Sequence, residues 1–316
     1  MKHILTLTFI LFVVLSQAQV RIISYNVENL FDTQNDSLTQ DEDFLPDGKY
    51  HWTYSRYQRK LENISRVVAN IGKWDTPTIV GLCEVENEQC IKDLLNIGGL
   101  RKYGYKYLHQ DSPDERGIDC ALLYDPKQFH IIDNCFIPIP MPQEERPTRD
   151  IVYAKGVIKL TGRGHHLNTD TLHILLCHLP SQLGGTEQTA HKRLIAYRIL
   201  QHTIDSIAHA DFMAKILVMG DMNSTPAEHL RGMHNLMIQT EKEGKGTHKW
   251  KGVWSCLDQF YVSQSLIDRA KANIYSDYWL LEEDKAFGGD IPMRCFVGLR
   301  WQAGYSDHLP IYLDLF

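Results

Sequence analysis

The sequence predicts a mixed α/β domain, because short apolar runs typical of buried strands alternate with amphipathic helical segments. The strand signal is clearest at residues 216–219, four apolar residues followed by Gly220 and by turn formers at 224–226. The helix signal is clearest at 54–71, where apolar residues recur at intervals of three and four. With 316 residues and no linker, repeat or low-complexity tract, the chain fits one large domain.

The remaining elements follow from the same two periodicities. Residues 32–52 are acidic and rich in turn formers, which predicts an exposed loop. Its Asp41, Asp43 and Asp47 could bind calcium, but the spacing and terminal Glu of an EF-hand are missing, so a solvated loop is favoured. Further strands are predicted at 20–25, 78–83, 119–124, 149–160, 172–179, 253–263 and 311–315, and further helices at 86–96 and 190–208.

Residues 1–18 have the pattern of a Sec signal peptide. Lys2 and His3 precede an apolar run over 4–15, and Ser16 to Ala18 form a small-x-small cleavage pattern before Gln19. The run is too short to span a bilayer comfortably, and no other stretch approaches that length. We therefore expect residues 19–316 to form one exported domain, periplasmic or extracellular and monomeric, without stable membrane insertion and without an implied protein partner.

Charge and cysteine content limit the function classes. The formal net charge of -6 lacks the basic excess of a tight nucleic-acid binder, but it does not exclude an enzyme that holds phosphate through metal ions. Seven cysteines are scattered along the chain, and four of them lie within apolar strand-like runs. Buried free thiols are therefore predicted in preference to a disulfide framework, although export would permit one bridge.

Polar side chains stand at six predicted strand boundaries. Taken alone, the Asp221 and Asn223 pair is as compatible with an ordinary turn as with a site. A period of two, however, continues the apolar face of Leu217 and Met219 into Asp221, and an unpaired carboxylate there would be costly. Asp258 lies in a similar apolar row. The boundary residues are Asn26, Glu84, His178, Asp221 with Asn223, Asp258, and Asp307 with His308.

These residue types suit a hard divalent cation. Carboxylate and amide oxygens are its preferred ligands, and the two histidines could serve proton or phosphate chemistry. Zinc is disfavoured because no Cys-x-x-Cys or His-Glu-x-x-His pattern occurs. Glu84 has acidic neighbours, so Glu86 competes with it for the role of metal ligand.

In their order along the chain, these motifs resemble the endonuclease/exonuclease/phosphatase superfamily, which includes exonuclease III and deoxyribonuclease I. The resemblance covers essentially all of residues 19–316. The matching segments are SYNVENLF with Asn26, GLCEVEN with Glu84, LLCHLPSQLGG with His178, VMGDMNSTP with Asp221 and Asn223, SCLDQFYVS with Asp258, and YSDHLPIY with Asp307 and His308.

The resemblance implies a fold and a reaction. The fold is an α+β, four-layer α/β sandwich, with two mixed β-sheets packed face to face, helices on the outside and the motif loops at one edge. The reaction is metal-dependent hydrolysis of a phosphoester. The implied roles are metal binding (Mg²⁺ or Mn²⁺) by Glu84, Asn26 and Asp307, water activation by Asp221 with Asn223, phosphate stabilisation by His178 and His308, and orientation of His308 by Asp258.

One position departs from the family pattern. Gln182 stands where similar sequences carry a basic residue, so the substrate phosphate needs another cationic partner. Arg116 and Arg149 are candidates, with a surface salt bridge as the favoured alternative for each.

The substrate stays open at this stage. We favour a nuclease-like phosphodiesterase, whose partner would be a nucleic acid. A sphingomyelinase-like lipid phosphodiesterase and a small-molecule phosphatase are the alternatives, and no added hairpin rich in Trp and Phe marks a lipid-surface enzyme. A non-catalytic binding module on the same fold is the alternative from a different class. It predicts the loss of at least one motif, and none is lost.

Overall fold

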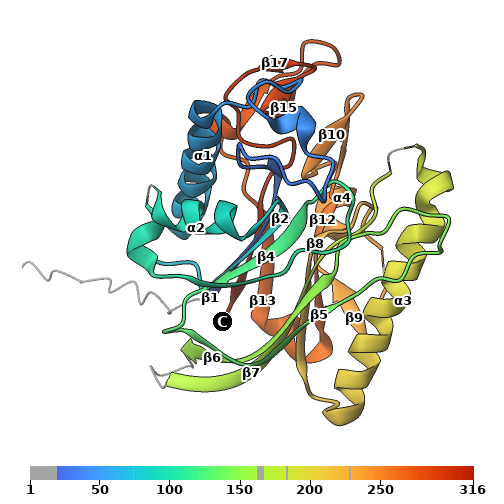
Figure 1. Ribbon diagram of the computed structural model, residues 1–316. Coiled ribbons are helices and arrows are strands. Elements are labelled where there is room, and N and C mark those ends of the chain that lie inside the picture. The colour runs from blue at the N-terminus through green and yellow to red at the C-terminus, as the bar shows by residue number, and fades with distance from the viewer. Residues whose placement is uncertain (1–19, 74, 98, 162–166, 183, 228) are drawn as a thin grey trace, which may run out of the picture.

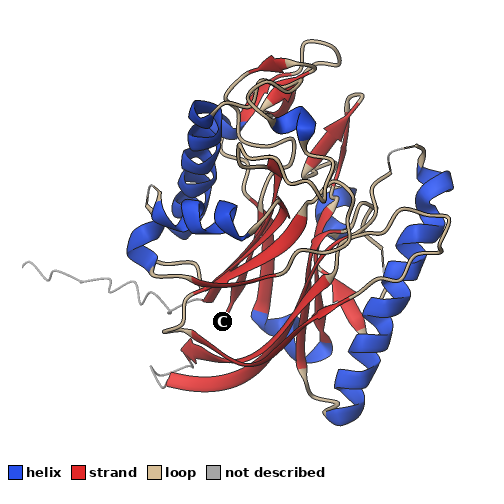
Figure 2. Ribbon diagram, in the orientation of Figure 1, coloured by secondary structure: helices blue, strands red, loops and turns tan. Residues whose placement is uncertain are grey.

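The computed structural model describes all residues except 1–19, 74, 98, 162–166, 183 and 228, so the expected signal peptide lies outside the described residues. Two six-stranded sheets form its centre (Figures 1 and 2). The first sheet has the order β13 (Ala270–Ile274), β18 (Ile311–Leu315), β1 (Val20–Leu30), β2 (Ile79–Val85), β4 (Asp119–Tyr124) and β3 (Lys106–His109). The second has the order β5 (Phe129–Ile137), β6 (Ile151–Thr161), β7 (Leu167–His178), β8 (Lys215–Asp221), β12 (Asp258–Ser263) and β9 (Met233–Asn235).

Helices and small hairpins complete the described chain. The α-helices are α1 (Tyr54–Gly72), α2 (Glu88–Asn96), α3 (Thr186–Ala210) and α4 (Ile238–Lys242). The hairpins are β10 (His248–Trp250) with β11 (Val253–Ser255), β14 (Leu281–Glu283) with β15 (Asp290–Pro292), and β16 (Phe296–Val297) with β17 (Arg300–Trp301). Short 3-10 helices are η1 (Glu42–Phe44), η2 (Leu100–Tyr103), η3 (Gln264–Arg269) and η4 (Tyr278–Leu280).

Three apolar cores separate four layers. The central core joins the facing sides of the two sheets, with Ile22 and Leu122 from the first sheet against Leu176, Met219 and Phe260 from the second. Because side chains alternate along a strand, the other face of each sheet must be covered separately.

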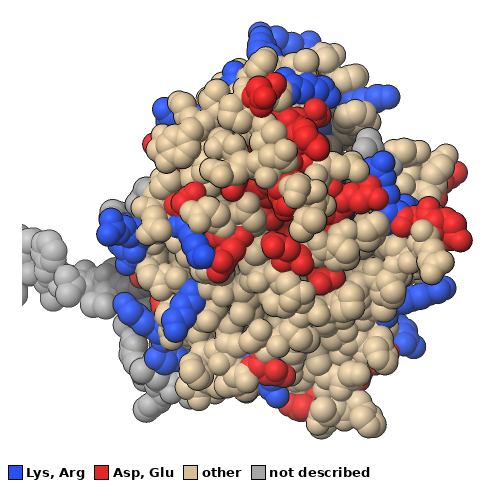
Figure 3. Space-filling view, in the orientation of Figure 1, with Lys and Arg blue, Asp and Glu red and all other residues tan. Residues whose placement is uncertain are grey.

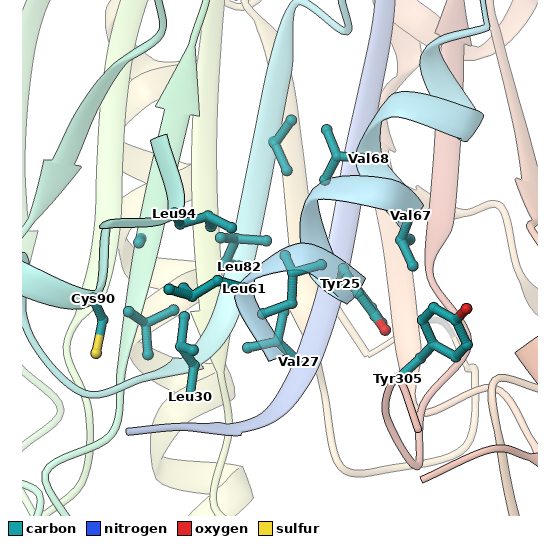
Figure 4. Packing of buried hydrophobic residues seen from close by; sticks show 14 of the residues in the cluster. Tyr25, Val27, Leu30, Leu61, Val67, Val68, Leu82, Cys90, Leu94 and Tyr305 are labelled. Atoms are coloured by element: carbon teal, nitrogen blue, oxygen red, sulfur yellow. The ribbon is translucent and has the colours of Figure 1, made fainter. Parts of the chain in front are cut away.

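Helices cover both outer faces. The apolar side of α1, including Leu61 and Val68, packs against Tyr25 and Leu82 of the first sheet (Figure 4). The helix α2 adds Leu94 to the same core. On the second sheet, the residues of α3 that pack inward are Ala196, Leu200 and Ile204, and they meet Leu175 and Val218. The predicted four-layer sandwich with two mixed sheets is therefore confirmed.

The strand directions bring the motif residues to one edge. Within the first sheet β1 and β2 are parallel, and within the second β7 and β8 are parallel. The carboxyl ends of these four strands carry Asn26, Glu84, His178 and Asp221. The adjacent β12 is antiparallel to β8, so its first residue, Asp258, lies at the same edge.

The structure corrects the prediction for residues 32–52. This segment was expected to be an exposed loop, but its aromatic residues pack into the core beneath α1 and against Phe296 and Trp301. Phe31 stacks on Phe44 with ring centroids 4.4 Å apart, and Trp52 is buried and donates its indole N–H to the Phe31 carbonyl. The acidic composition concealed an aromatic set that anchors the segment, while polar residues such as Glu42 and Asp43 stay exposed.

The structure also corrects the single strand predicted over 253–263, which is divided into two strands, β11 and β12. The chain leaves the ladder at Cys256 and Leu257, where the Thr247 hydroxyl accepts hydrogen bonds from the backbone N–H groups of Leu257 and Asp258. Residues 253–255 instead pair with β10. Side-chain alternation alone could not reveal this change of partner.

Two composition-based expectations can also be compared with the structure. All seven cysteines are free, and all except Cys135 are buried. Across the described parts of the chain, no helix combines the length and apolarity that a membrane crossing requires.

Gly220 gives a test of the strand-end geometry. It has a φ of 135°, and an added Cβ would lie 1.8 Å from the Cys177 carbonyl oxygen. We expect Gly220→Ala to lower the free energy of unfolding by about 3 kcal/mol or more in urea denaturation.

The matched control is Gly99→Ala, whose new Cβ would meet only the Ala69 Cβ at 3.7 Å. Its stability should change by less than about 0.5 kcal/mol. Equal stability of the two variants would contradict the described backbone at the end of β8.

Candidate active site

The second sheet places three predicted site residues in one row. His178 at the end of β7 is the register partner of Asp221 at the end of β8, and Asp221 is in turn the partner of Asp258 at the start of β12. All three side chains are buried. His178 Nε2 lies 3.6 Å from Asp221 Oδ2. Cross-strand pairing therefore fixes this half of the site.

The first sheet contributes Asn26 and Glu84. Asn26 Nδ2 donates to Asp221 Oδ2 at 3.0 Å and to Glu84 Oε1 at 3.3 Å, so it connects the two sheets. Glu84 Oε1 also lies 3.8 Å from His178 Nε2. Glu84 Oε2 accepts from the backbone N–H of Asn29 at 2.9 Å. These contacts bring side chains from both sheets into one cluster.

The competing acid, Glu86, belongs to a different cluster. Its Oε2 accepts from the backbone N–H of Asp32 at 2.6 Å, and Cys90 lies beside it. Burial raises the pKa of Glu86 to about 8. Glu84, and not Glu86, is therefore the acid from this motif that joins the site.

Asp258 and His308 form a buried ion pair. His308 Nδ1 lies 2.7 Å from Asp258 Oδ2, and His308 Nε2 lies 3.9 Å from Asp221 Oδ2. Burial opposes the charged imidazolium, but the carboxylates of Asp258 and Asp221 raise the pKa of His308 well above its ordinary 6.5. Its Nδ1 proton is thereby directed to Asp258, and its Nε2 proton faces Asp221.

Two further groups have shifted protonation equilibria. Burial, with Asp258 as a neighbouring like charge, raises the pKa of Asp221 to about 6. Burial, with Arg149 and Arg116 nearby, lowers the pKa of His178 well below 6.5. At neutral pH the site therefore combines an ionised Asp221, a neutral His178 and a charged His308.

Asn223 connects Asp221 to the neighbouring strand. Its backbone N–H donates to Asp221 Oδ1 at 2.8 Å, and its Nδ2 donates to the Leu179 carbonyl at 2.9 Å. The first contact orients the Asp221 carboxylate, and the second ties the turn after β8 to the end of β7.

Asp307 is held by a charge network. Arg294 Nη2 lies 3.0 Å from Asp307 Oδ2, and Arg294 Nε lies 3.3 Å from Glu28 Oε1. The Glu28 carboxylate also accepts from the backbone N–H of Cys295 at 2.8 Å. Ser306 Oγ donates to the Asn26 carbonyl at 2.7 Å, which places the segment that carries Asp307 beside the end of β1.

The two candidate phosphate-binding arginines lie at the site. Arg149 is only 5% exposed, so the salt bridge predicted for it as an alternative is buried and not at the surface. Its Nη2 lies 3.5 Å from His178 Nε2, and its Nε lies 3.6 Å from Asp114 Oδ2. Arg116 is more exposed, and its Nη2 lies 4.0 Å from Glu84 Oε2. Each arginine therefore faces both the site and a carboxylate.

Several residues at the strand ends adopt left-handed backbone conformations. Glu28, Asn29, Glu84 and Asn223 have φ values of 54°, 57°, 68° and 47°. Such conformations are costly for residues other than glycine and persist where surrounding contacts enforce them. For Glu28, Asn29 and Glu84 they accompany the bulges near the ends of β1 and β2, and for Asn223 the turn after β8.

The donor set fits a hard divalent cation. Glu84 provides carboxylate oxygens beside Asn26, and Asp307 follows Ser306, whose hydroxyl is bonded to the Asn26 carbonyl; carboxylate oxygens are what such cations prefer. Asn26 presents its Nδ2 to Glu84, and its Oδ1 accepts from the backbone N–H of Glu28 at 3.0 Å. Asn26 would therefore ligate a cation on the Glu84 side after rotation of its amide group.

Sequence reasoning missed three residues of this region. Glu28 and Arg294 form the network behind Asp307, and only Glu28 lies within a recognised motif. His248 forms a bridge with His308, and its ring centroid is 5.0 Å from that of His308. Burial, with His308 nearby, lowers the pKa of His248 to about 4. No sequence signal singled out His248, because its role depends on a pairing distant along the chain.

The ion pair predicts a measurable effect of Asp258→Asn. Loss of this carboxylate should lower the pKa of His308 from its raised value, as followed by NMR titration of the metal-free protein. The pair stabilises the fold fully below the unfolded-state pKa of about 6.5, and this contribution is lost as pH rises through the folded-state pKa of His308.

Asp314→Asn is the control, because Asp314 pairs with Arg21 in a separate ion pair of the first sheet. An unchanged titration of His308 in Asp258→Asn would contradict the assigned contact.

Solved structures with a similar fold cover nearly the whole chain. A truncated TDP2 from Caenorhabditis elegans is 16% identical with a TM-score of 0.59, and the match covers 95% of this chain and 98% of that one. A mannosyl-6-phosphatase from Bacteroides thetaiotaomicron is 15% identical with a TM-score of 0.53, covering 94% and 100%. A Danio rerio TDP2 complexed with a single-strand DNA product is 16% identical with a TM-score of 0.54, covering 95% and 99%.

The sequence comparisons address the family directly. A search of curated proteins finds no match to the chain. Residues 21–316, however, match the profile described as Endonuclease/Exonuclease/phosphatase family. Since this match spans nearly all of the described residues, the protein belongs to the endonuclease/exonuclease/phosphatase family of phosphoesterases.

Proposed function

We propose that this protein is a divalent-metal-dependent phosphodiesterase of the nuclease-like type. The observation that carries the proposal is the placement of Asp221, with a pKa of about 6, between the neutral His178 and the charged His308. A carboxylate of that pKa is ionised at neutral pH and suits the role of general base. The histidines on either side can donate hydrogen bonds to phosphoryl oxygens.

The proposed metal ligands are Glu84, Asp307 and Asn26. When bound, Mg²⁺ or Mn²⁺ would polarise a phosphoryl oxygen and stabilise the leaving alkoxide. Asp221 and Asn223 are proposed to activate the attacking water. Asp221 accepts a proton from the attacking water while Asn223 fixes the carboxylate through its backbone N–H.

The two histidines have different proposed roles. His308 donates a hydrogen bond from Nε2 to a non-bridging phosphoryl oxygen, and Asp258 maintains its charged form. His178 is neutral and donates as a weaker partner on the opposite side. Arg149, 3.5 Å from His178, is proposed to add positive charge next to the phosphate, and Arg116 to act similarly near Glu84.

A small phosphoester is a second candidate substrate, favoured by the charges around the site. The three arginines there are each next to a carboxylate: Arg116 to Glu84, Arg149 to Asp114, and Arg294 to Asp307. Figure 3 shows Asp and Glu gathered across the upper middle of this face, with Lys and Arg mainly toward its margins. Such a surface gives little attraction for a long polyanion.

Export is proposed separately. It rests only on the signal-peptide pattern of residues 1–18. A substrate outside the cytoplasm would follow from it.

Asp221→Asn tests the proposed general base. The amide keeps the side-chain shape but cannot accept the proton, so kcat should fall by about 10²- to 10⁴-fold while the circular dichroism spectrum is retained. Asp314→Asn, far from the site, is the matched control and should retain turnover. Near-native turnover of Asp221→Asn would remove Asp221 from the proposed mechanism.

Metal removal tests the proposed cofactor and separates the substrates. We expect EDTA to abolish hydrolysis and Mg²⁺ or Mn²⁺ to restore it, assayed on plasmid DNA, RNA, sphingomyelin and p-nitrophenyl phosphate. Restored cleavage of DNA or RNA would support the nuclease-like assignment, and cleavage of p-nitrophenyl phosphate alone would favour the small phosphoester. Hydrolysis that resists EDTA would contradict the mechanism.

A further inference from the structure

The β10–β11 hairpin begins inside the candidate active site. His248, the first residue of β10, bridges to His308, and the two rings are tilted by 42° with centroids 5.0 Å apart. A potential ligand atom of His248 lies within 4.8 Å of those of Asp307 and His308. From this point the hairpin projects beyond the ends of the two sheets, beside β12 (Figure 1). Its first residue therefore faces the place where the phosphate would react.

One face of the hairpin is apolar and exposed. Trp250 lies two residues beyond His248 and therefore on the same face. Val253 is the cross-strand partner of Trp250, which places its side chain on that face as well. Trp250 and Val253 are 66% and 67% exposed. One face of the hairpin thus leads from His248, beside His308, to an exposed indole.

The opposite face anchors the hairpin to the protein. Lys249 Nζ lies 2.8 Å from Asp284 Oδ2 and donates to the Gly288 carbonyl at 2.7 Å. Lys249 and Asp284 are both buried, so this attachment is not a loose surface contact. A Cβ added at Gly252, at the tip, would lie 3.0 Å from the Phe287 Cβ. The tip therefore also contacts the loop between β14 and β15 that carries Asp284 and Gly288. The hairpin thus fixes the position of Trp250 while leaving its side chain exposed to solvent. An exposed aromatic side chain in a fixed position near a reactive centre is typical of a binding surface.

We propose that the exposed hairpin face, formed by His248, Trp250 and Val253, binds a nucleobase attached to the scissile phosphate. This inference rests on the proposed function and narrows its substrate class to nucleotide-containing phosphodiesters. A flat indole stacks on the π-face of any base, so recognition would be tolerant of base identity.

The small size of the exposed face favours a nucleobase over a lipid surface. Its exposed apolar side chains are Trp250 and Val253. Stable binding to a membrane surface needs a large buried apolar area, whereas a single nucleotide unit needs only one stacking partner and the metal-bound phosphate. Lys251 Nζ, 5.8 Å from the Trp250 ring, provides a cation next to the base.

The test compares two phosphodiesters with the same leaving group: thymidine 5′-p-nitrophenyl phosphate and methyl p-nitrophenyl phosphate. Both release p-nitrophenolate, so they differ only in the nucleoside. We expect the wild-type protein to prefer the thymidine ester. Trp250→Ala should lower kcat/KM for that ester roughly tenfold, mainly through KM, and leave the methyl ester within about twofold.

Phe212→Ala is the matched control. Phe212 is an exposed aromatic just before β8, at the end of that strand opposite Asp221, and it should affect neither ester. Equal wild-type rates for the two esters, or an equal loss on both in Trp250→Ala, would overturn the nucleobase assignment while leaving the hydrolytic function intact. Trp250-dependent association with sphingomyelin vesicles would overturn it in favour of a lipid surface. Failure to hydrolyse either ester with Mg²⁺ or Mn²⁺ would instead contradict the proposed function itself.

Discussion

The buried ion pair between Asp258 and His308 is the interaction on which the site depends. Asp258 begins β12 of the second sheet, and His308 lies three residues before Ile311, the start of β18 in the first sheet, so the pair joins the sheets at one edge. A buried carboxylate and imidazolium are stable there only together, because either alone would be an unpaired charge in a poorly solvated place. Asp221 is the cross-strand partner of Asp258, and the positive charge of His308 acts to lower the pKa of Asp221. The pair therefore holds the site together and also sets its proton equilibria.

The backbone at this edge departs from regular strand geometry where it carries the site residues. Glu84 and Asn223 adopt left-handed conformations, and Gly220 allows β8 to pass close to the Cys177 carbonyl. Such departures are tolerated because three apolar cores fix the strands on which they occur. The sandwich thus acts as a rigid support, and the chemistry is placed in short deviations at the ends of its central strands.

Much of this arrangement could be predicted from the chain, since apolar runs and the polar residues at their ends are local signals. Alternation correctly placed Asp258 in an apolar row that needs a partner, and the family resemblance supplied His308 as that partner. Local signals could not reveal contacts between distant segments. Arg294 reaches Glu28 across 266 positions, and His248 meets His308 through a hairpin that the alternating pattern had merged with β12. Residues 32–52 were misjudged because their acidic composition outweighed a few aromatic anchors.

We propose that the six strand boundaries build one cation-dependent hydrolytic centre around Glu84. Anomalous X-ray diffraction from crystals soaked in Mn²⁺ tests this arrangement most directly, because it locates the ion without reference to turnover. We expect a peak within about 2.5 Å of Glu84 oxygens, with Asp307 and a rotated Asn26 completing the protein ligands. A dominant peak at the separate Asp32, Glu86 and Cys90 cluster, or no peak near Glu84 at saturating Mn²⁺, would contradict it.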